Sequence, residues 1–248
     1  GTNTVSPSTG DTSFTFSTQK ATSATYGVTV QANPTGQTCT ISNASGIVAS
    51  QSISNIAVTC TSNPRTLSGT ITGLTTSGLV INNGSDELTV SSGASTFQLG
   101  STVASGATYS VTIKTQPTGK TCSLANGSGT MTSAAVSNVQ VTCATNSYTL
   151  GGSISGLVTS GLKLKNGSET LTISSGSSSL IFNTQVSYGG GYSVTIDTQP
   201  TGYTCSLSNS SGTMGAANIT SVQVTCAINS YSLSGSISGL DVSGLKIK

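Results

Sequence analysis

The sequence has neither histidine nor tryptophan, and only eight basic and six acidic side chains among its 248 residues. About a quarter of the residues are charged in an ordinary soluble domain, so this surface is unusually neutral. The net charge of +2 gives no field that would attract nucleic acid or an anionic membrane. No apolar run approaches the roughly 20 residues that cross a bilayer. We therefore expect neither a nucleic-acid partner nor a membrane span.

The missing histidines also limit the chemistry, because histidine is the commonest general base and metal ligand. Adjacent Asp86 and Glu87 would point to opposite faces of a strand, which favours a solvated turn over a catalytic pair. Serine-rich runs have no base to activate a hydroxyl. Glu169 aligns with Asp86, beside the Asn-Gly turn, and the other carboxylates lie at different phases of the repeat: Asp11, Asp197 and Asp241. We expect no catalytic residue, no metal site and no cofactor, and therefore no enzyme.

What the chain does contain is an internal repeat. The cysteines recur every 83 residues, at Cys39, Cys122 and Cys205 and again at Cys60, Cys143 and Cys226. The text around them also recurs without gaps, which is typical of tandem repeat proteins. The period predicts two complete repeats, residues 63–145 and 146–228. Residues 1–62 would form a repeat that lacks its first two strands, and residues 229–248 would be the first two strands of a further repeat.

Within each repeat, apolar residues alternate with serine and threonine in short runs, as β-strands do. In the third repeat Leu150 and Ile154 share a face, and Leu162 and Leu164 alternate with lysines before Asn166-Gly167. Asn-Gly predicts a two-residue hairpin turn with these two residues at its centre. About seven such strands in 83 residues, with no helical period, indicate an all-β fold of tandem immunoglobulin-like β-sandwich domains.

The cysteine spacing of 21 residues predicts one disulfide per repeat: Cys39–Cys60, Cys122–Cys143 and Cys205–Cys226. In the third repeat both cysteines would lie in the last hairpin, which we expect to turn near Met214 and Gly215. A closed loop of this size stabilises the fold by about 3 kcal/mol. Regular disulfides also indicate an oxidising compartment, so we expect an extracellular or cell-surface location.

Two groups of polar side chains have an alternative interpretation as binding features. Lys163, Lys165, Lys246 and Lys248 could form a basic stripe, but lysines facing outward from an edge strand also prevent aggregation, and we prefer that interpretation. Asn-x-Ser/Thr sequons permit a glycan without requiring one, because such matches arise by chance in a chain rich in serine and threonine. They begin at Asn43, Asn83, Asn126, Asn166, Asn209 and Asn218.

The segments Tyr109–Cys143 and Tyr192–Cys226 share a pattern that runs YSVTI, TQPTG, TCSL, SGTM, VQVTC. This pattern resembles the tandem immunoglobulin-like repeats of bacterial secreted and cell-surface proteins. The resemblance extends over essentially the whole chain. It implies a stalk, adhesin shaft or fibre module, and it brings no catalytic residues.

The two ends of the sequence suggest how such modules would join. Gly1 aligns with Gly84 and Gly167, and Lys248 aligns with Lys165, so the two ends together make one repeat less a single residue. We expect apolar side chains of the last segment to act as polymerisation strands: Tyr231, Leu233, Ile237, Leu240, Leu245 and Ile247. Their partner would be a second copy, joined by strand complementation, or a continuation of the same chain.

Both partners give an extracellular filament or stalk of domains joined head to tail. The alternative is an adhesin shaft or binding module that recognises a glycan or protein through exposed loops. Such a module would carry one aromatic-rich loop unlike its repeats. Tyr188 and Tyr192, around Gly189–Gly191, come nearest to this description, because Ser105 stands where the third repeat has Tyr188. Near-identical repeats suit spacing and strength better than recognition, so we prefer the filament.

Overall fold

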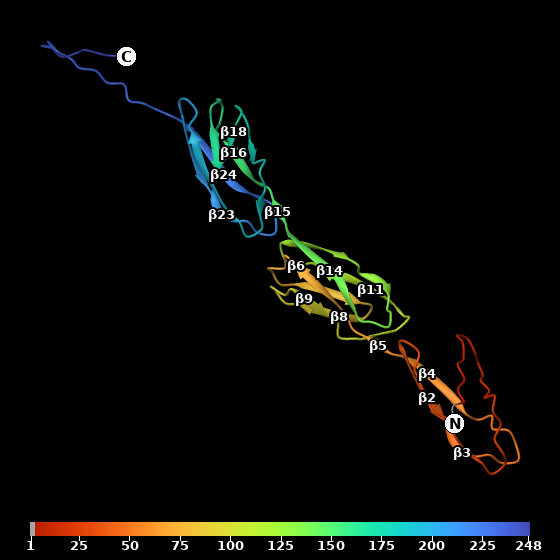
Figure 1. Ribbon diagram of the computed structural model, residues 1–248. Coiled ribbons are helices and arrows are strands. Elements are labelled where there is room, and N and C mark those ends of the chain that lie inside the picture. The colour runs from red at the N-terminus through yellow and green to blue at the C-terminus, as the bar shows by residue number, and fades with distance from the viewer. Residues whose placement is uncertain (1–2) are drawn as a thin grey trace. The chain divides into compact units, whose positions relative to one another are not determined.

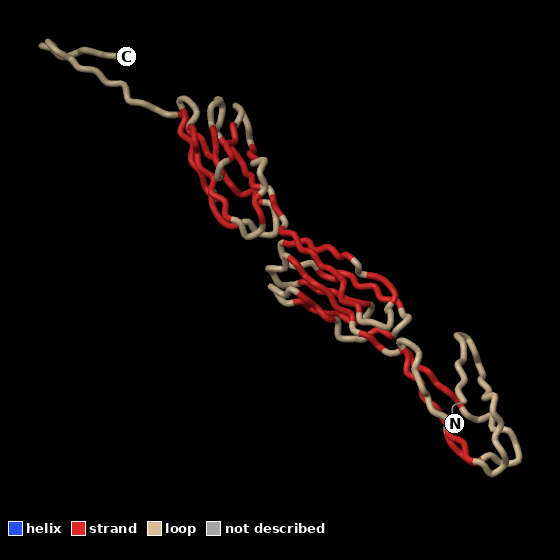
Figure 2. The backbone as a smooth tube through the Cα atoms, viewed as in Figure 1, coloured by secondary structure: helices blue, strands red, loops and turns tan. Residues whose placement is uncertain are grey.

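A computed structural model describes residues 3–248, so the expected opening of the first repeat at Gly1 lies outside the described residues. Within them the chain consists of strands and loops without a helix, as the red and tan segments of Figure 2 show. The chain divides into two compact units. The first contains Gly1–Pro117 and Cys122–Cys143, and the second contains Thr118–Thr121 and Ala144–Lys248.

The third repeat forms two four-stranded sheets with a short accessory pair. The strand orders are β19-β16-β24-β22 and β18-β17-β21-β23, and β15 pairs with β20. The strands are β15 (Ser147–Tyr148), β16 (Leu150–Ser155), β17 (Lys163–Asn166), β18 (Glu169–Thr172), β19 (Ser179–Ile181), β20 (Val186–Ser187), β21 (Gly191–Thr198), β22 (Tyr203–Ser208), β23 (Ser211–Thr213) and β24 (Ile219–Ile228). The first and last long strands, β16 and β24, run parallel, and Figure 1 shows them beside each other.

The core of this repeat lies between the two sheets and is formed by every second residue of the strands. Leu150, Leu162, Leu164 and Val222 are fully buried there, with Phe182 packed among them. Alternate residues, mostly serine, threonine and lysine, face solvent. This alternation is what a two-sheet sandwich with one wet face per sheet requires.

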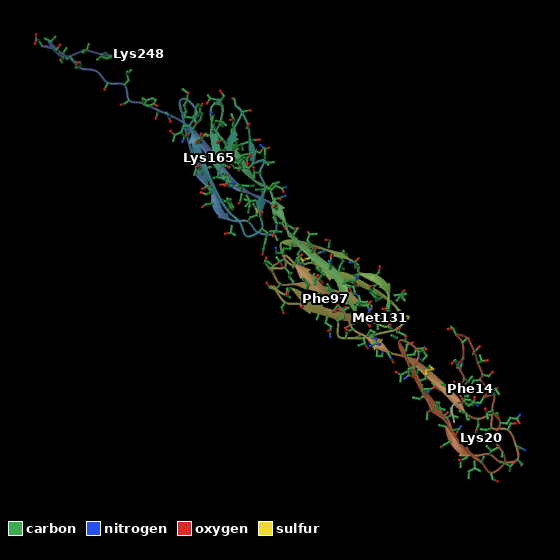
Figure 3. The ribbon with its side chains drawn as sticks, viewed as in Figure 1. Phe14, Lys20, Phe97, Met131, Lys165 and Lys248 are labelled. Atoms are coloured by element: carbon green, nitrogen blue, oxygen red, sulfur yellow. A yellow bond between two sulfur atoms is a disulfide. The ribbon has the colours of Figure 1, made fainter. Side chains whose placement is uncertain are left out.

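The second repeat has the same arrangement 83 residues earlier, with sheets β12-β14-β6-β9 and β13-β11-β7-β8 and the pair β10-β5. Its strands are β5 (Pro64–Arg65), β6 (Leu67–Thr72), β7 (Leu79–Asn83), β8 (Asp86–Val90), β9 (Thr96–Gln98), β10 (Val103–Ala104), β11 (Thr108–Thr115), β12 (Lys120–Ala125), β13 (Ser128–Thr130) and β14 (Val136–Thr145). Phe97 and Met131, labelled in Figure 3, belong to its core. The prediction of an all-β chain of tandem β-sandwich domains is therefore confirmed.

The first repeat contains only four described strands: β1 (Thr25–Gly27), β2 (Gln37–Ser42), β3 (Ser45–Ile47) and β4 (Ala57–Ser62). They form two separate pairs, β1-β3 and β2-β4. Residues after Ile228 form no strand among those that the structure describes.

Each of the three repeats contains one disulfide, Cys39–Cys60, Cys122–Cys143 and Cys205–Cys226, drawn in yellow in Figure 3. Cys205 lies directly opposite Cys226 in the β22-β24 pairing. The expected hairpin turn near Met214 and Gly215 is wrong, however. The segment between the two cysteine strands crosses to the other sheet, where β23 pairs with β21, and Met214 is buried in the core.

The position of the Asn-Gly turn is also wrong by one residue. Asn166 pairs with Glu169 in the β17-β18 hairpin, so the two-residue loop is Gly167 and Ser168. Gly167 alone has a positive φ there, 58°, and the first loop position is where a hairpin of this kind needs glycine. Asn166 instead uses its side-chain oxygen to accept the backbone N–H of Ser193 at 3.0 Å.

The prediction that Lys163 and Lys165 lie on an edge strand is wrong. They lie on β17, which is paired on both sides, with β18 and with β21. Their side chains do face solvent, because the alternating Leu162 and Leu164 occupy the core.

Candidate assembly surface

The complete repeats show what the first two long strands of a repeat do. In the third repeat β16 lies between β19 and β24, and β17 lies between β18 and β21, so each is central in its sheet. Ile154 pairs with Val224 in the parallel register of β16 and β24. Five apolar side chains of this segment are buried, each at most 6% exposed, and they are Leu150, Ile154, Leu157, Leu162 and Leu164.

The same side chains recur 83 residues later in a segment that packs against nothing. Leu150 is fully buried, whereas its equivalent Leu233 is 102% exposed. Ile154 is 6% exposed and its equivalent Ile237 is 57% exposed. The other predicted polymerisation residues are also exposed: Tyr231, Leu240, Leu245 and Ile247. We call residues 231–248 the free strand segment; Figure 2 draws it entirely in tan.

The first repeat has the complementary deficiency. Among the described residues before Leu67, no hydrophobic side chain is buried. β4 pairs only with β2, whereas the equivalent β24 pairs with both β22 and β16. Val58 on β4 is 43% exposed, whereas its equivalent Val224 is 1% exposed. The first repeat therefore presents an apolar face and an unpaired strand edge where complete repeats hold their first two strands.

One glycine of the free strand segment, Gly235, has no local reason to be glycine. A Cβ on Gly152 would lie 1.8 Å from the carbonyl oxygen of Val222, and one on Gly69 would lie 2.1 Å from that of Val139. The equivalent Gly235 has no heavy atom within 4 Å of that position. Sequence reasoning missed this feature, although the recurrence of glycine every 83 residues was a visible signal.

Gly239, further along the same segment, also lacks the contact that its equivalents make. Gly73 and Gly156 have positive φ, and a Cβ on either would lie 2.1 Å from the carbonyl oxygen of Cys143 or Cys226. Gly239 keeps the positive φ, 73°, but nothing lies within 4 Å. The free strand segment thus keeps the glycines that close contact with the last strand of a repeat requires, although no such strand lies beside it.

The carboxylates hold loops instead of forming a reactive group. Glu169 accepts the backbone N–H groups of Asn183 and Thr184 at 2.7 and 3.0 Å. Asp86, at the same position of the second repeat, accepts the N–H of Ser101 at 2.7 Å. Burial opposes ionisation of Glu169, but the hydrogen bonds together outweigh it and lower its pKa. These carboxylates stay partly exposed beside the turn and also hold the loop that follows.

Glu87, next to Asp86 on β8, pairs with Lys114 on β11, across the intervening strand β7. Among the described residues no three His, Cys, Asp or Glu side chains are grouped as a metal ion would need. A hollow of about 440 Å³ beside β6 and β9 is lined by Ser, Thr, Gly, Gln and Phe97, none of which titrates near neutral pH. Within residues 3–248, no helix is long and apolar enough to cross a membrane.

The sequon asparagines have structural roles. Asn43, Asn126 and Asn209 adopt positive φ, and their Nδ2 groups donate to carbonyls 12 residues further on. The side-chain oxygens of Asn83, Asn166 and Asn218 accept backbone N–H groups. These roles explain why asparagine stands at all six positions without involving a glycan.

The aromatic loop residues are likewise engaged within the fold. A Cβ on Gly119 would lie 2.2 Å from the ring of Tyr188, so this half-buried ring covers the glycine. The Tyr192 ring lies against Gly212 in the same way, within 3.2 Å of the added atom. Neither tyrosine is presented to solvent as a recognition loop would present it.

No protein-family model matches the chain, and no curated protein matches its sequence. Similar solved structures include the TIE protein of Bacillus anthracis, with 14% identity and a TM-score of 0.44 over 69% of this chain. The chain spans about a third, 36%, of the length of that protein. The SpaA shaft pilin of Lactobacillus rhamnosus GG, in a mutant form, has 12% identity and a TM-score of 0.25, covering 68% of this chain and 100% of the pilin.

The major pilin of Streptococcus pyogenes has 11% identity and a TM-score of 0.25, covering 68% of this chain and 98% of the pilin. Scores at this level carry no argument about function. The case for function therefore rests on the molecule itself.

Proposed function

We propose that this chain is a structural, non-enzymatic segment of an extracellular filament or stalk, built from immunoglobulin-like repeats joined head to tail. The three disulfides support an oxidising location such as a bacterial surface or the surrounding medium. The near-neutral surface and the structural use of carboxylates, asparagines and tyrosines support a role in spacing and strength.

The joining mechanism is strand complementation. The free strand segment of one copy inserts into the open first repeat of the next and supplies the two missing central strands. The single observation that carries this proposal is the contrast in burial: Leu150 is fully buried and Leu233 is 102% exposed, although they are equivalent residues. Exposed apolar strands and open strand edges favour association with a partner of matching shape.

In the docked state the register follows that of the complete repeats. Ile237 would pair with Val58 in parallel, as Ile154 pairs with Val224. Gly235 would then face the carbonyl oxygen of Ile56, because Gly152 faces that of Val222. A side chain at position 235 is tolerated in the free chain and excluded in the docked one.

The test is therefore Gly235→Ala in the full chain. Sedimentation of the wild type at rising concentration should show head-to-tail assembly, and Gly235→Ala should stay unassembled because its methyl group would meet the acceptor carbonyl. Thermal unfolding of the two complete repeats should not change, since the methyl contacts nothing in its own chain.

Ser236→Ala is the matched control, because the equivalent Thr70 and Ser153 face solvent in the complete repeats. It should assemble like the wild type. If Gly235→Ala assembles at the wild-type concentration, or if the wild type does not assemble, the proposal is wrong.

A further inference from the structure

One hydrogen-bond arrangement occurs intact twice in the chain and half-formed a third time. In the first unit Asn63 donates its N–H to the carbonyl of Gly36 at 2.8 Å and accepts the hydroxyl of Thr38 on its side-chain oxygen at 2.7 Å. Its own carbonyl accepts the N–H of Ser105 at 3.1 Å. Asn63 thus holds the turn before β2 on one side and the turn before β11 on the other.

The second unit contains the same joint around Asn146. Its N–H donates to Gly119 at 2.9 Å, its side-chain oxygen accepts from Thr121 at 2.8 Å, and its carbonyl accepts the N–H of Tyr188 at 2.8 Å. In both joints, the residue that donates this last N–H also covers the glycine whose carbonyl accepts the asparagine N–H. Tyr188 lies over Gly119, and Ser105 lies over Gly36 within 2.6 Å of an added Cβ.

Asn229 has the first two bonds of this joint without the third. It donates to Gly202 at 2.9 Å and accepts from Thr204 at 2.7 Å. No backbone N–H in residues 3–248 donates to its carbonyl, and Gly202 has nothing within 4 Å of an added Cβ. Half of a joint is therefore preformed just before the free strand segment.

The first repeat contains a turn of the kind that supplies the third hydrogen bond in the complete joints. Residues Ala21–Ala24 form a turn, with the N–H of Ala24 on the carbonyl of Ala21 at 3.1 Å. Ser23 donates to Val48 at 2.8 Å, as its equivalent Gly106 donates to Met131 at 2.7 Å. This is the conformation of the corresponding turns in both complete repeats. Thr22 occupies the place of Ser105 and Tyr188.

From these two halves we infer that Thr22 of a second copy docks on Gly202 and donates its N–H to the carbonyl of Asn229. The inference rests on the proposed function, which supplies the second copy, and adds a contact surface outside the donated strands. Ser230 and Tyr231 would then pair with Ala21 and Lys20, as Ser147 and Tyr148 pair with Ser187 and Val186. The joint between copies becomes the same as the joint within one.

The turn geometry allows a substitution that removes the backbone N–H donor and keeps the turn. Ser23 has φ 69°, so the turn is of the type whose third position is left-handed and whose second position favours proline. Thr22→Pro keeps that turn and deletes the N–H donor. Thr22→Ala keeps the donor and is the matched control.

The full-length variants should be compared by the concentration at which each assembles. Losing one joint hydrogen bond should raise that concentration about fivefold for Thr22→Pro relative to Thr22→Ala, which keeps the bond and also lacks the threonine side chain. A peptide of residues 231–248 lacks Asn229, so it should bind Thr22→Pro and wild type equally well. Equal assembly of Thr22→Pro and wild type would overturn the joint while leaving the proposed function intact.

A second variant, in the copy that supplies the strands, covers the case in which Thr22→Pro no longer binds the peptide of residues 231–248. That result would mean that Thr22→Pro has damaged the first repeat. Asn229→Ala deletes the acceptor of the Thr204 hydroxyl, so it should raise the assembly concentration two- to fivefold, with unchanged unfolding of the second repeat and at most a small loss of stability in the third. In that case, wild-type assembly of Asn229→Ala overturns the joint. A wild type that never assembles overturns the proposed function and the joint together.

Discussion

Single residues of this chain hold backbone groups at positions that recur in every repeat. Gln116 donates to the carbonyl of Cys122 and accepts its N–H, and Gln199 makes the same two bonds with Cys205. Asn33 makes one of them with Cys39. Short polar side chains therefore position the cysteine strands after each Pro-containing turn, which explains how a chain with so few charges keeps its loops ordered.

Glu169 makes the same kind of contact through a charge, and this gives a pH dependence of known sign. Its pKa is lowered in the fold, so its stabilising contribution is present above its ordinary pKa of 4.5 and is lost as the pH falls through the lower folded value. Glu169→Gln should lower the urea midpoint of the third repeat slightly at pH 7 and not at pH 2. Equal midpoints for both proteins at pH 7 would contradict this role.

At the scale of strands, the sequence predicted the elements better than their pairing. The 83-residue period and the alternation around Leu162 and Leu164 were enough to identify the strands and the sandwich. The parallel pairing of β16 with β24 joins residues about 70 positions apart, and local patterns carry no information about it. For the same reason the central position of β17 and the crossing of β23 to the opposite sheet were not foreseen.

In the candidate assembly surface too, the sequence revealed the residues but not their partners. The apolar polymerisation residues were visible because each repeats a core position. The joint around Asn63, Asn146 and Asn229 was not visible, because an asparagine between strands is typical of any turn. Its role depends on three hydrogen-bond partners from distant segments, which only the fold brings together.

The disulfide of the first repeat is more exposed than those of the two complete repeats. Cys122, Cys143, Cys205 and Cys226 are at most 7% exposed. Cys39 is half-buried and Cys60 is exposed, because the first repeat has no sandwich around them. We expect a mild thiol reductant to open Cys39–Cys60 about tenfold faster than the other two in the unassembled chain.

Alkylation and mass spectrometry after short exposure to the reductant would measure the three rates. Assembly should slow the reduction of Cys39–Cys60 toward the rate of the buried pairs, because the donated strands complete the sandwich around it. The account would be contradicted by equal rates for all three disulfides in the unassembled chain, or by a Cys39–Cys60 rate that assembly leaves unchanged.

For the whole molecule, we propose that each copy carries an open repeat and the strands that close the next one. Closure buries apolar side chains on both sides, such as Val58 and Ile237, so association is driven by the hydrophobic effect. The chain has no histidine, the side chain whose charge ordinarily changes between pH 5 and 8. Assembly by this route should therefore depend on concentration and hardly on pH.

The most direct test is hydrogen exchange of the full chain, measured by mass spectrometry below and above its assembly concentration. Below it, the amides of residues 231–248 should exchange as fast as in an unstructured peptide. Above it, they should become as protected as those of Leu150–Ser155, and β1 and β4 should gain protection with them. An assembly in which residues 231–248 still exchange freely would contradict strand complementation.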